Sequence, residues 1–152
     1  SKYEEVKGMK IRRAIIEKKI ADIIDSVNLI DERLSIDFDD FKRLGFIKDG
    51  IYKKIEFAIE NILDICSIIN SDLNLGIPEA EDSILDNLER EKLFSKQFID
   101  IVREMKGFRN ILVHRYGEID DKIAFETIKE GLTDFDLLVK EIEELLKKGN
   151  IP

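Results

Sequence analysis

Apolar residues, many of them isoleucine, recur at alternating intervals of four and three positions along most of this 152-residue chain. The first run, within residues 9–34, has at these positions Ile16, Ile20, Ile23, Val27, Ile30 and Leu34. The second run has Ile51, Ile55, Ala58, Ile62, Ile65 and Ile69. Because an α-helix turns once every 3.6 residues, this spacing places the apolar side chains on one face, which a core can bury. The sequence therefore predicts an all-α protein.

Capping and turn residues divide the chain into four main helices and short extra ones. The main helices are expected over about 9–34, 46–72, 96–116 and 120–149, with short turns or helices at 35–45 and 83–93. Ser83 and Ser95 are the expected caps of two of these helices, and Gly131 is a candidate kink in the last one. A chain of this length suits one domain over residues 1–152. We predict an up-and-down bundle of four main helices.

Composition excludes several classes of protein. No run of more than three consecutive apolar residues occurs, so no membrane span is predicted, and the N-terminus lacks the apolar segment of a secretory signal. The chain has one Cys and one His, so neither a disulfide nor a cysteine or multi-histidine metal site is expected within it. The net charge of −8 argues against non-specific nucleic-acid binding by the whole surface. We expect a cytoplasmic protein without metal or cofactor.

A ridge of acidic residues lies on the second long helix at intervals of four positions, at Glu56, Glu60 and Asp64. A solvated face is favoured over a metal site for this ridge, because Lys53 and Lys54 are nearby. Tyr52, on the same helix, has no neighbours in the sequence that suggest chemistry.

Positive charge is concentrated between residues 90 and 116, which also contain the single histidine. This segment carries a charge of +4 within the −8 chain. Its seven basic residues are Arg90, Lys92, Lys96, Arg103, Lys106, Arg109 and Arg115. Such a segment predicts a local patch that attracts a phosphate-bearing partner.

Helical spacing sorts the residues around the histidine. Lys106, Asn110 and His114 are four positions apart and share one face, and Arg109 shares a neighbouring face with Tyr116. Arg109 and His114 are five positions apart, a rotation of about 140°. They converge on one ligand only if the helix ends near His114 or if a second subunit completes the groove. We expect both side chains to be exposed, and a homodimer to bring two copies of residues 103–116 together.

These groups suit the cleavage of RNA without a metal ion. A neutral His114 can take the proton from a ribose 2′-OH, while the Arg109 guanidinium binds the scissile phosphate. Asn110, Lys106 and Arg103 are the candidate supporting residues for substrate binding. Two other classes stay open. One is a non-catalytic helical module that binds a nucleotide or a nucleotidyltransferase partner, and the other is a helical adaptor without a ligand.

The set Arg109, Asn110 and His114 resembles the motif of the HEPN superfamily, in which an Arg and a polar residue precede a His by a few positions. With the further Tyr116, the motif resembles that of the HepT branch, the toxin half of HepT/MntA toxin–antitoxin pairs. The resemblance implies a helical ribonuclease with Arg109 and His114 at a homodimer interface. It also implies that an MntA-like nucleotidyltransferase antitoxin silences the toxin by AMPylation of Tyr116. The expected substrate is RNA, whether tRNA or mRNA, with neither DNA nor a membrane as partner.

Overall fold

The computed structural model describes residues 11–34 and 36–149, and these residues form helices joined by short turns, with no strand among them. The helices are, in chain order, α2 (Arg13–Arg33), α3 (Phe38–Lys42), α4 (Phe46–Asp72), α5 (Glu81–Arg90), α6 (Lys96–His114), the 3₁₀ turn η1 (Tyr116–Glu118) and α7 (Asp121–Gly149). The predicted all-α class is therefore confirmed.

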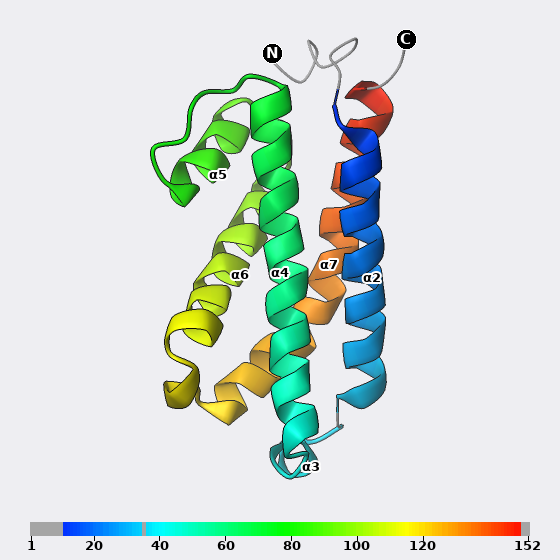
Figure 1. Ribbon diagram of the computed structural model, residues 1–152, viewed down its shortest axis with the longest axis vertical. Coiled ribbons are helices and arrows are strands. Elements are labelled where there is room, and N and C mark those ends of the chain that lie inside the picture. The colour runs from blue at the N-terminus through cyan, green and yellow to red at the C-terminus, as the bar shows by residue number, and fades with distance from the viewer. Residues whose placement is uncertain (1–10, 35, 150–152) are drawn as a thin grey trace.

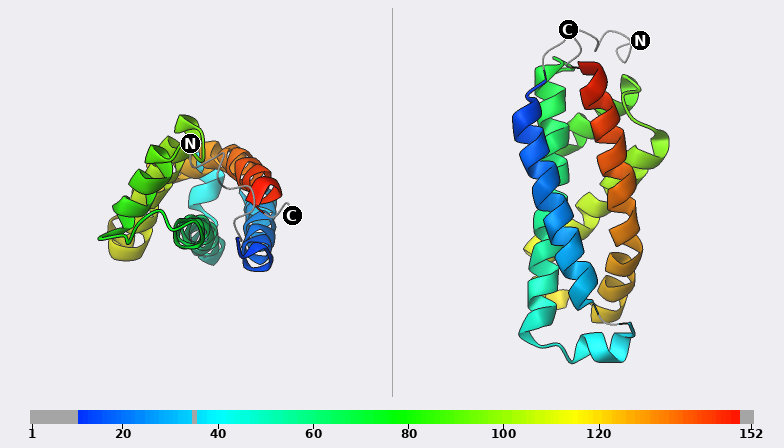
Figure 2. Two further views of the ribbon diagram at one scale, coloured as in Figure 1. Left: turned by 90° about the horizontal axis from the view of Figure 1, so that it is seen from above. Right: turned by 90° about the vertical axis from the view of Figure 1, so that its right-hand side faces the viewer.

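Four long helices alternate in direction (Figure 1). In that view α2 runs downward, α4 upward, α6 downward and α7 upward, with α3 at the lower end and α5 beside the upper part of α6. Seen from above, α7 crosses behind α4, from the side of α6 to the side of α2 (Figure 2). The arrangement is the predicted up-and-down bundle of four main helices with short extra ones.

The apolar faces of the helices meet in one buried cluster. All six apolar positions of the second run are buried, including Ala58, Ile62, Ile65 and Ile69, which are fully inaccessible to solvent. Val27, Leu34 and Phe108 lie at the edge of the cluster and are only partly buried. The spacing of four and three therefore identified the core-facing side of each long helix.

The helix ends agree with the sequence at some positions and differ at others. Ser95 caps α6, because its hydroxyl oxygen accepts a hydrogen bond from the Phe98 N–H at 3.1 Å. Ser83 does not cap α5, which begins at Glu81 after Ala80, so the backbone is already helical at Ser83. Gly131 lies inside α7 without dividing it. Ser35, an expected turn residue, and residues 9–10 of the expected 9–34 helix lie outside the described residues. The helix α2 begins at Arg13.

Candidate functional site at the end of α6

Five of the six candidate residues lie on α6 and the sixth follows it directly. Arg103 lies near the middle of α6, Lys106, Arg109 and Asn110 lie in its second half, and His114 is its last residue. Arg115 leaves the helical conformation, with φ −135° and ψ 37°, and the chain then forms η1. The helix therefore ends at His114, as one of the two geometries for a common ligand requires. The expected common face of Arg109 and Tyr116 is wrong, because the helix stops between them.

Arg109 is buried, contrary to the sequence-based expectation that it is exposed. Only 9% of the residue is accessible, and its Nη1 donates to Glu60 Oε1 on α4 at 2.8 Å. Arg109 precedes the end of α6 by more than one turn, on the side that packs against α4. His114, in contrast, is exposed and Asn110 is half-buried.

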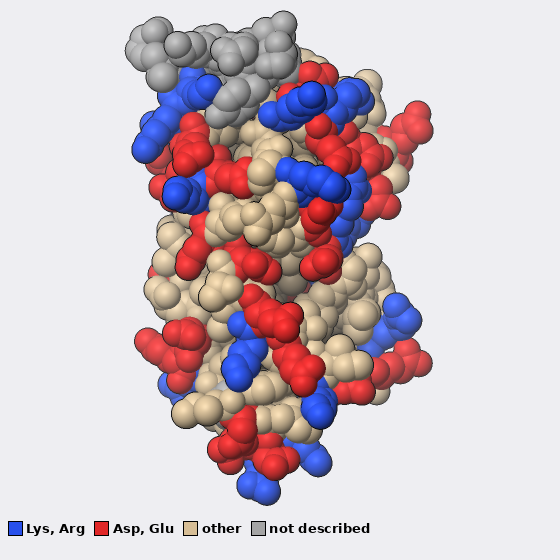
Figure 3. Space-filling model, turned by 180° about the vertical axis from the view of Figure 1, so that it is seen from behind, with Lys and Arg blue, Asp and Glu red and all other residues tan. Residues whose placement is uncertain are grey.

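The basic segment is paired with carboxylates of neighbouring helices. Lys106 Nζ lies 2.6 Å from Asp82 on α5, and Arg103 Nη2 lies 2.8 Å from Asp86 on the same helix. The Asp86 and Glu89 carboxylates together raise the pKa of Arg103, while Lys106 holds the pKa of Asp82 below its usual range. The segment is thus less electropositive than its own composition indicates, because folding brings α5 against α6. On the face shown in Figure 3, basic and acidic side chains are likewise intermixed, without a wide basic area.

The acidic ridge on α4 is divided among three cations. Glu56 pairs with Lys53 at 2.8 Å, Asp64 with Lys19 at 3.1 Å, and Glu60 with Arg109. The ridge is thus partly solvated, and the Glu60 carboxylate, whose side chain is 38% exposed, also holds a candidate site residue. Within residues 11–34 and 36–149, no three or more His, Cys, Asp and Glu side chains are grouped to hold a metal ion.

Tyr116 rests on the first turns of α4. Its hydroxyl donates to Asp49 Oδ1 at 2.5 Å, and its ring packs edge-to-face on Tyr52 with centroids 6.0 Å apart. The residue is 45% exposed, so a second molecule can reach it. Burial, followed by the hydrogen bond to Asp49 and its charge, raises the pKa of Tyr116 to about 12.

Tyr52 belongs to this arrangement, although no neighbour in the sequence suggested a chemical role for it. Its hydroxyl donates to Asp121 Oδ1 at 2.6 Å, and Lys48 Nζ contacts the other oxygen of Asp121 at 2.8 Å. Burial and the Asp121 carboxylate raise the pKa of Tyr52. Burial opposes ionisation of Asp121, but the bonds from Lys48 and Tyr52 outweigh it and lower the pKa of this carboxyl. Asp49 and Tyr52 are three positions apart and therefore lie on one face of the helix. This spacing is the sequence signal that could have identified them as joint neighbours of Tyr116.

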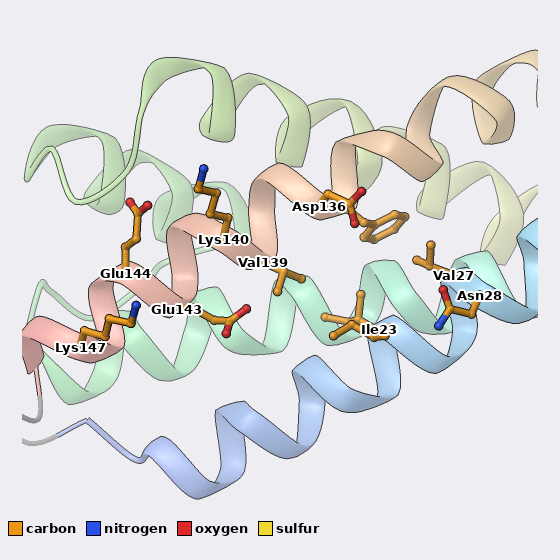
Figure 4. A pocket seen from close by; sticks show the side chains of 11 residues that line it. Ile23, Val27, Asn28, Asp136, Val139, Lys140, Glu143, Glu144 and Lys147 are labelled. Carbon is orange, nitrogen blue, oxygen red and sulfur yellow. The ribbon is translucent and has the colours of Figure 1, made fainter.

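A separate groove of about 390 Å³ lies between α2 and α7. Figure 4 shows apolar side chains such as Ile23 and Val139 in it, with Lys140, Glu143 and other charged groups around them. None of the six candidate residues lines this groove. No helix in the described part of the chain is both long and apolar enough to span a membrane.

Replacing Arg109 with Ala is expected to lower the free energy of unfolding by about 1–2 kcal/mol, because Glu60 loses its partner at a partly buried position. A change of about 0.5 kcal/mol is expected for an exposed residue. Urea unfolding followed by circular dichroism measures the difference. Arg103→Ala is the matched control, since its side chain is 35% exposed and its partners are exposed carboxylates. Equal destabilisation by the two variants would contradict the structural role of the Arg109–Glu60 pair.

An up-and-down helical bundle with Arg109, His114 and Tyr116 around the end of its third main helix has the fold and motif of a HEPN protein. More specifically, residues 23–142 match the model of the family described as "Ribonuclease HepT-like". The match spans more than half of the chain, so this protein belongs to the HepT-like ribonuclease family. The ribonuclease class predicted from the sequence is thereby confirmed.

Individual relatives agree with this assignment. The chain is 29% identical over 129 residues to the mRNA nuclease HepT of Shewanella oneidensis, covering 85% of this chain and 96% of that protein. It resembles the solved tri-AMPylated HEPN toxin of Shewanella oneidensis in complex with an MNT antitoxin, with a TM-score of 0.77 and 28% identity over 86% of this chain and 97% of that one. A crystal structure of a mutant toxin–antitoxin complex that contains MntA is similar to the same degree, with a TM-score of 0.77 and 27% identity over 86% and 98%.

Proposed function

We propose that this chain is the RNA-cutting toxin of a toxin–antitoxin pair and that a nucleotidyltransferase antitoxin silences it by AMPylation of Tyr116. The observation that carries the proposal is the placement of an exposed His114 at the end of α6, between Arg109 and Tyr116. The names of the relatives support it, because they include an mRNA nuclease and a toxin that is AMPylated in complex with its antitoxin.

In the proposed reaction, His114 removes the proton from a ribose 2′-OH, and the 2′-oxygen attacks the adjacent phosphorus. The Arg109 guanidinium binds the phosphate and offsets the charge that develops during the attack. The bond between phosphorus and the 5′-oxygen breaks and this oxygen takes up a proton from water, which leaves a 2′,3′-cyclic phosphate and a 5′-OH end. DNA lacks the 2′-OH and is therefore not a substrate.

The ion pairs of α6 set conditions on substrate binding. Glu60 accepts a hydrogen bond from the Arg109 guanidinium and orients it. An RNA phosphate must therefore bind Arg109 together with Glu60 or displace Glu60 from it. Lys106 and Arg103 support binding only where the RNA backbone competes with the α5 carboxylates. Asn110, half-buried one turn before His114, is placed to hold the histidine or the substrate by a hydrogen bond.

The proposed active form is a homodimer. Arg109 is directed against α4, whereas His114 is exposed at the helix end. A twofold partner that brings a second copy of residues 103–116 to the same cleft places the His114 of one subunit beside the Arg109 of the other.

Purified protein is expected to cut RNA in excess EDTA, because the proposed chemistry needs only side chains. Gel analysis of a labelled RNA gives the cleavage rate, and mass spectrometry of the fragments should find 2′,3′-cyclic phosphate and 5′-OH ends. The same protein should leave a DNA of matching sequence intact.

Two results would contradict this proposal in different ways. Loss of cleavage in EDTA with recovery on adding a divalent cation would replace the mechanism by a metal-dependent one. Tight binding of the nucleotidyltransferase partner without any RNA cleavage would favour the alternative function, a non-catalytic helical module.

A further inference from the structure

The hydroxyl of Tyr116 is held by a carboxylate that the proposed RNA cleavage does not use. Asp49 lies in the first turn of α4 and accepts the Tyr116 O–H at 2.5 Å. On the basis of the proposed function, we propose that Asp49 is the general base for AMPylation of Tyr116, so that the toxin itself supplies the group that activates its modified residue.

The position of the ring supports this role. Tyr52, one turn after Asp49 on α4, packs edge-to-face on the Tyr116 ring and fixes its orientation. At 2.5 Å, Asp49 Oδ1 is close enough to the Tyr116 hydroxyl to accept its proton during the reaction. Because nearly half of Tyr116 is exposed, the residue is both oriented by its contacts and accessible to a partner that carries a nucleotide.

Asp49 is better suited to this task than the other charged groups around the ring. Asp121 contacts Lys48 through one oxygen and Tyr52 through the other, which stabilises its ionised form and makes it a weak base. Glu56 acts on Tyr116 only through its charge. Asp49, in contrast, accepts the hydrogen bond of the reacting oxygen directly.

A base is needed because the free phenolate is rare. With a pKa of about 12, only about one Tyr116 hydroxyl in 10⁵ is ionised at pH 7. In the proposed step, the phenolic oxygen forms a bond to the α-phosphorus of ATP as its proton passes to Asp49 Oδ1. The bond between the α-phosphorus and the oxygen that bridges to the β-phosphorus breaks, and pyrophosphate leaves.

Asp49→Asn separates this role from a purely structural one. The amide can still accept the hydrogen bond but is not a base, and it also removes a charge that raises the pKa of Tyr116. A base mechanism therefore predicts slower AMPylation, whereas attack by a preformed phenolate predicts faster AMPylation. The two mechanisms give effects of opposite sign.

The experiment measures the rate of AMP addition by intact-mass spectrometry, with the cognate MntA-like nucleotidyltransferase, ATP and Mg²⁺, between pH 6 and pH 9. The ratio of the variant rate to the wild-type rate cancels the pH dependence of the partner enzyme. We expect the Asp49→Asn ratio to be about 10⁻² to 10⁻⁴ at pH 7. The ratio should rise by up to about tenfold per pH unit as phenolate forms.

Glu118→Gln is the matched control, because it removes one exposed carboxylate from the same turn as Tyr116. Its ratio should be close to 1 at every pH. An Asp49→Asn ratio of 1 or more at pH 7, or a reduced ratio that does not change with pH, would overturn the assignment of Asp49 as the base. Absence of AMP addition to the wild-type protein would instead refute the proposed modification itself.

Discussion

Replacing His114 with Ala is expected to reduce RNA cleavage by about 10²- to 10⁴-fold, the usual contribution of a general base. The side chain is exposed at the end of α6, so the free energy of unfolding should change by no more than about 0.5 kcal/mol. Cleavage of a labelled RNA and urea unfolding measure the two quantities on the same preparation. Gln97→Ala, an exposed change at the other end of α6, is the control and should retain full activity.

A mixture of two inactive proteins distinguishes a composite site from a site within one subunit. If His114 of one subunit works with Arg109 of the other, subunits carrying His114→Ala and Arg109→Ala should form heterodimers with one intact site. Random pairing then recovers about a quarter of the wild-type activity, because half the dimers are mixed and each has one of two sites. The dimer itself should give about twice 17.7 kDa by light scattering. A mixture that remains inactive, although heterodimers form, would place both residues of each site in one subunit.

Replacing Tyr116 with Phe is expected to abolish AMP addition by the cognate nucleotidyltransferase, because the acceptor oxygen is absent. RNA cleavage should stay close to the wild-type rate, and the partner should no longer suppress it in the presence of ATP. Added AMP places a bulky anion two positions after His114, where it opposes the RNA backbone by volume and charge. Intact-mass spectrometry and a cleavage assay on the same samples provide the test.

The Phe variant keeps the ring that packs on Tyr52 and loses only the hydrogen bond to Asp49. Its free energy of unfolding should therefore fall by no more than about 1 kcal/mol. If the partner still modifies and silences this variant, another residue is the acceptor, and the role assigned to Tyr116 is wrong.

The sequence predicted features that depend on neighbouring positions and missed those that depend on the register between helices. The Ser95 cap involves a residue three positions away, and the buried face containing Ile62 and Ile65 follows from helical periodicity. The Arg109–Glu60 pair joins residues 49 positions apart on two helices, so only their packing determines that these side chains meet. The charge of +4 is correct for residues 90–116 alone. The carboxylates that offset it lie on α5, another helix, so the sequence segment by itself overstates the positive charge at this surface.

The contacts of Asp121 with Lys48 and Tyr52 span 73 and 69 positions of the chain. Closing loops of this length reduces the conformational entropy of the chain, and the packing of α4 and α7 into the shared core must compensate for that loss. The surroundings of Tyr116 are therefore a property of the complete bundle. A chain truncated before Asp121 would still contain Asp49, His114 and Tyr116, yet it would lack the group that holds Tyr52 under the Tyr116 ring. The proposed modification site is thus assembled by the whole fold, whereas its sequence motif is local.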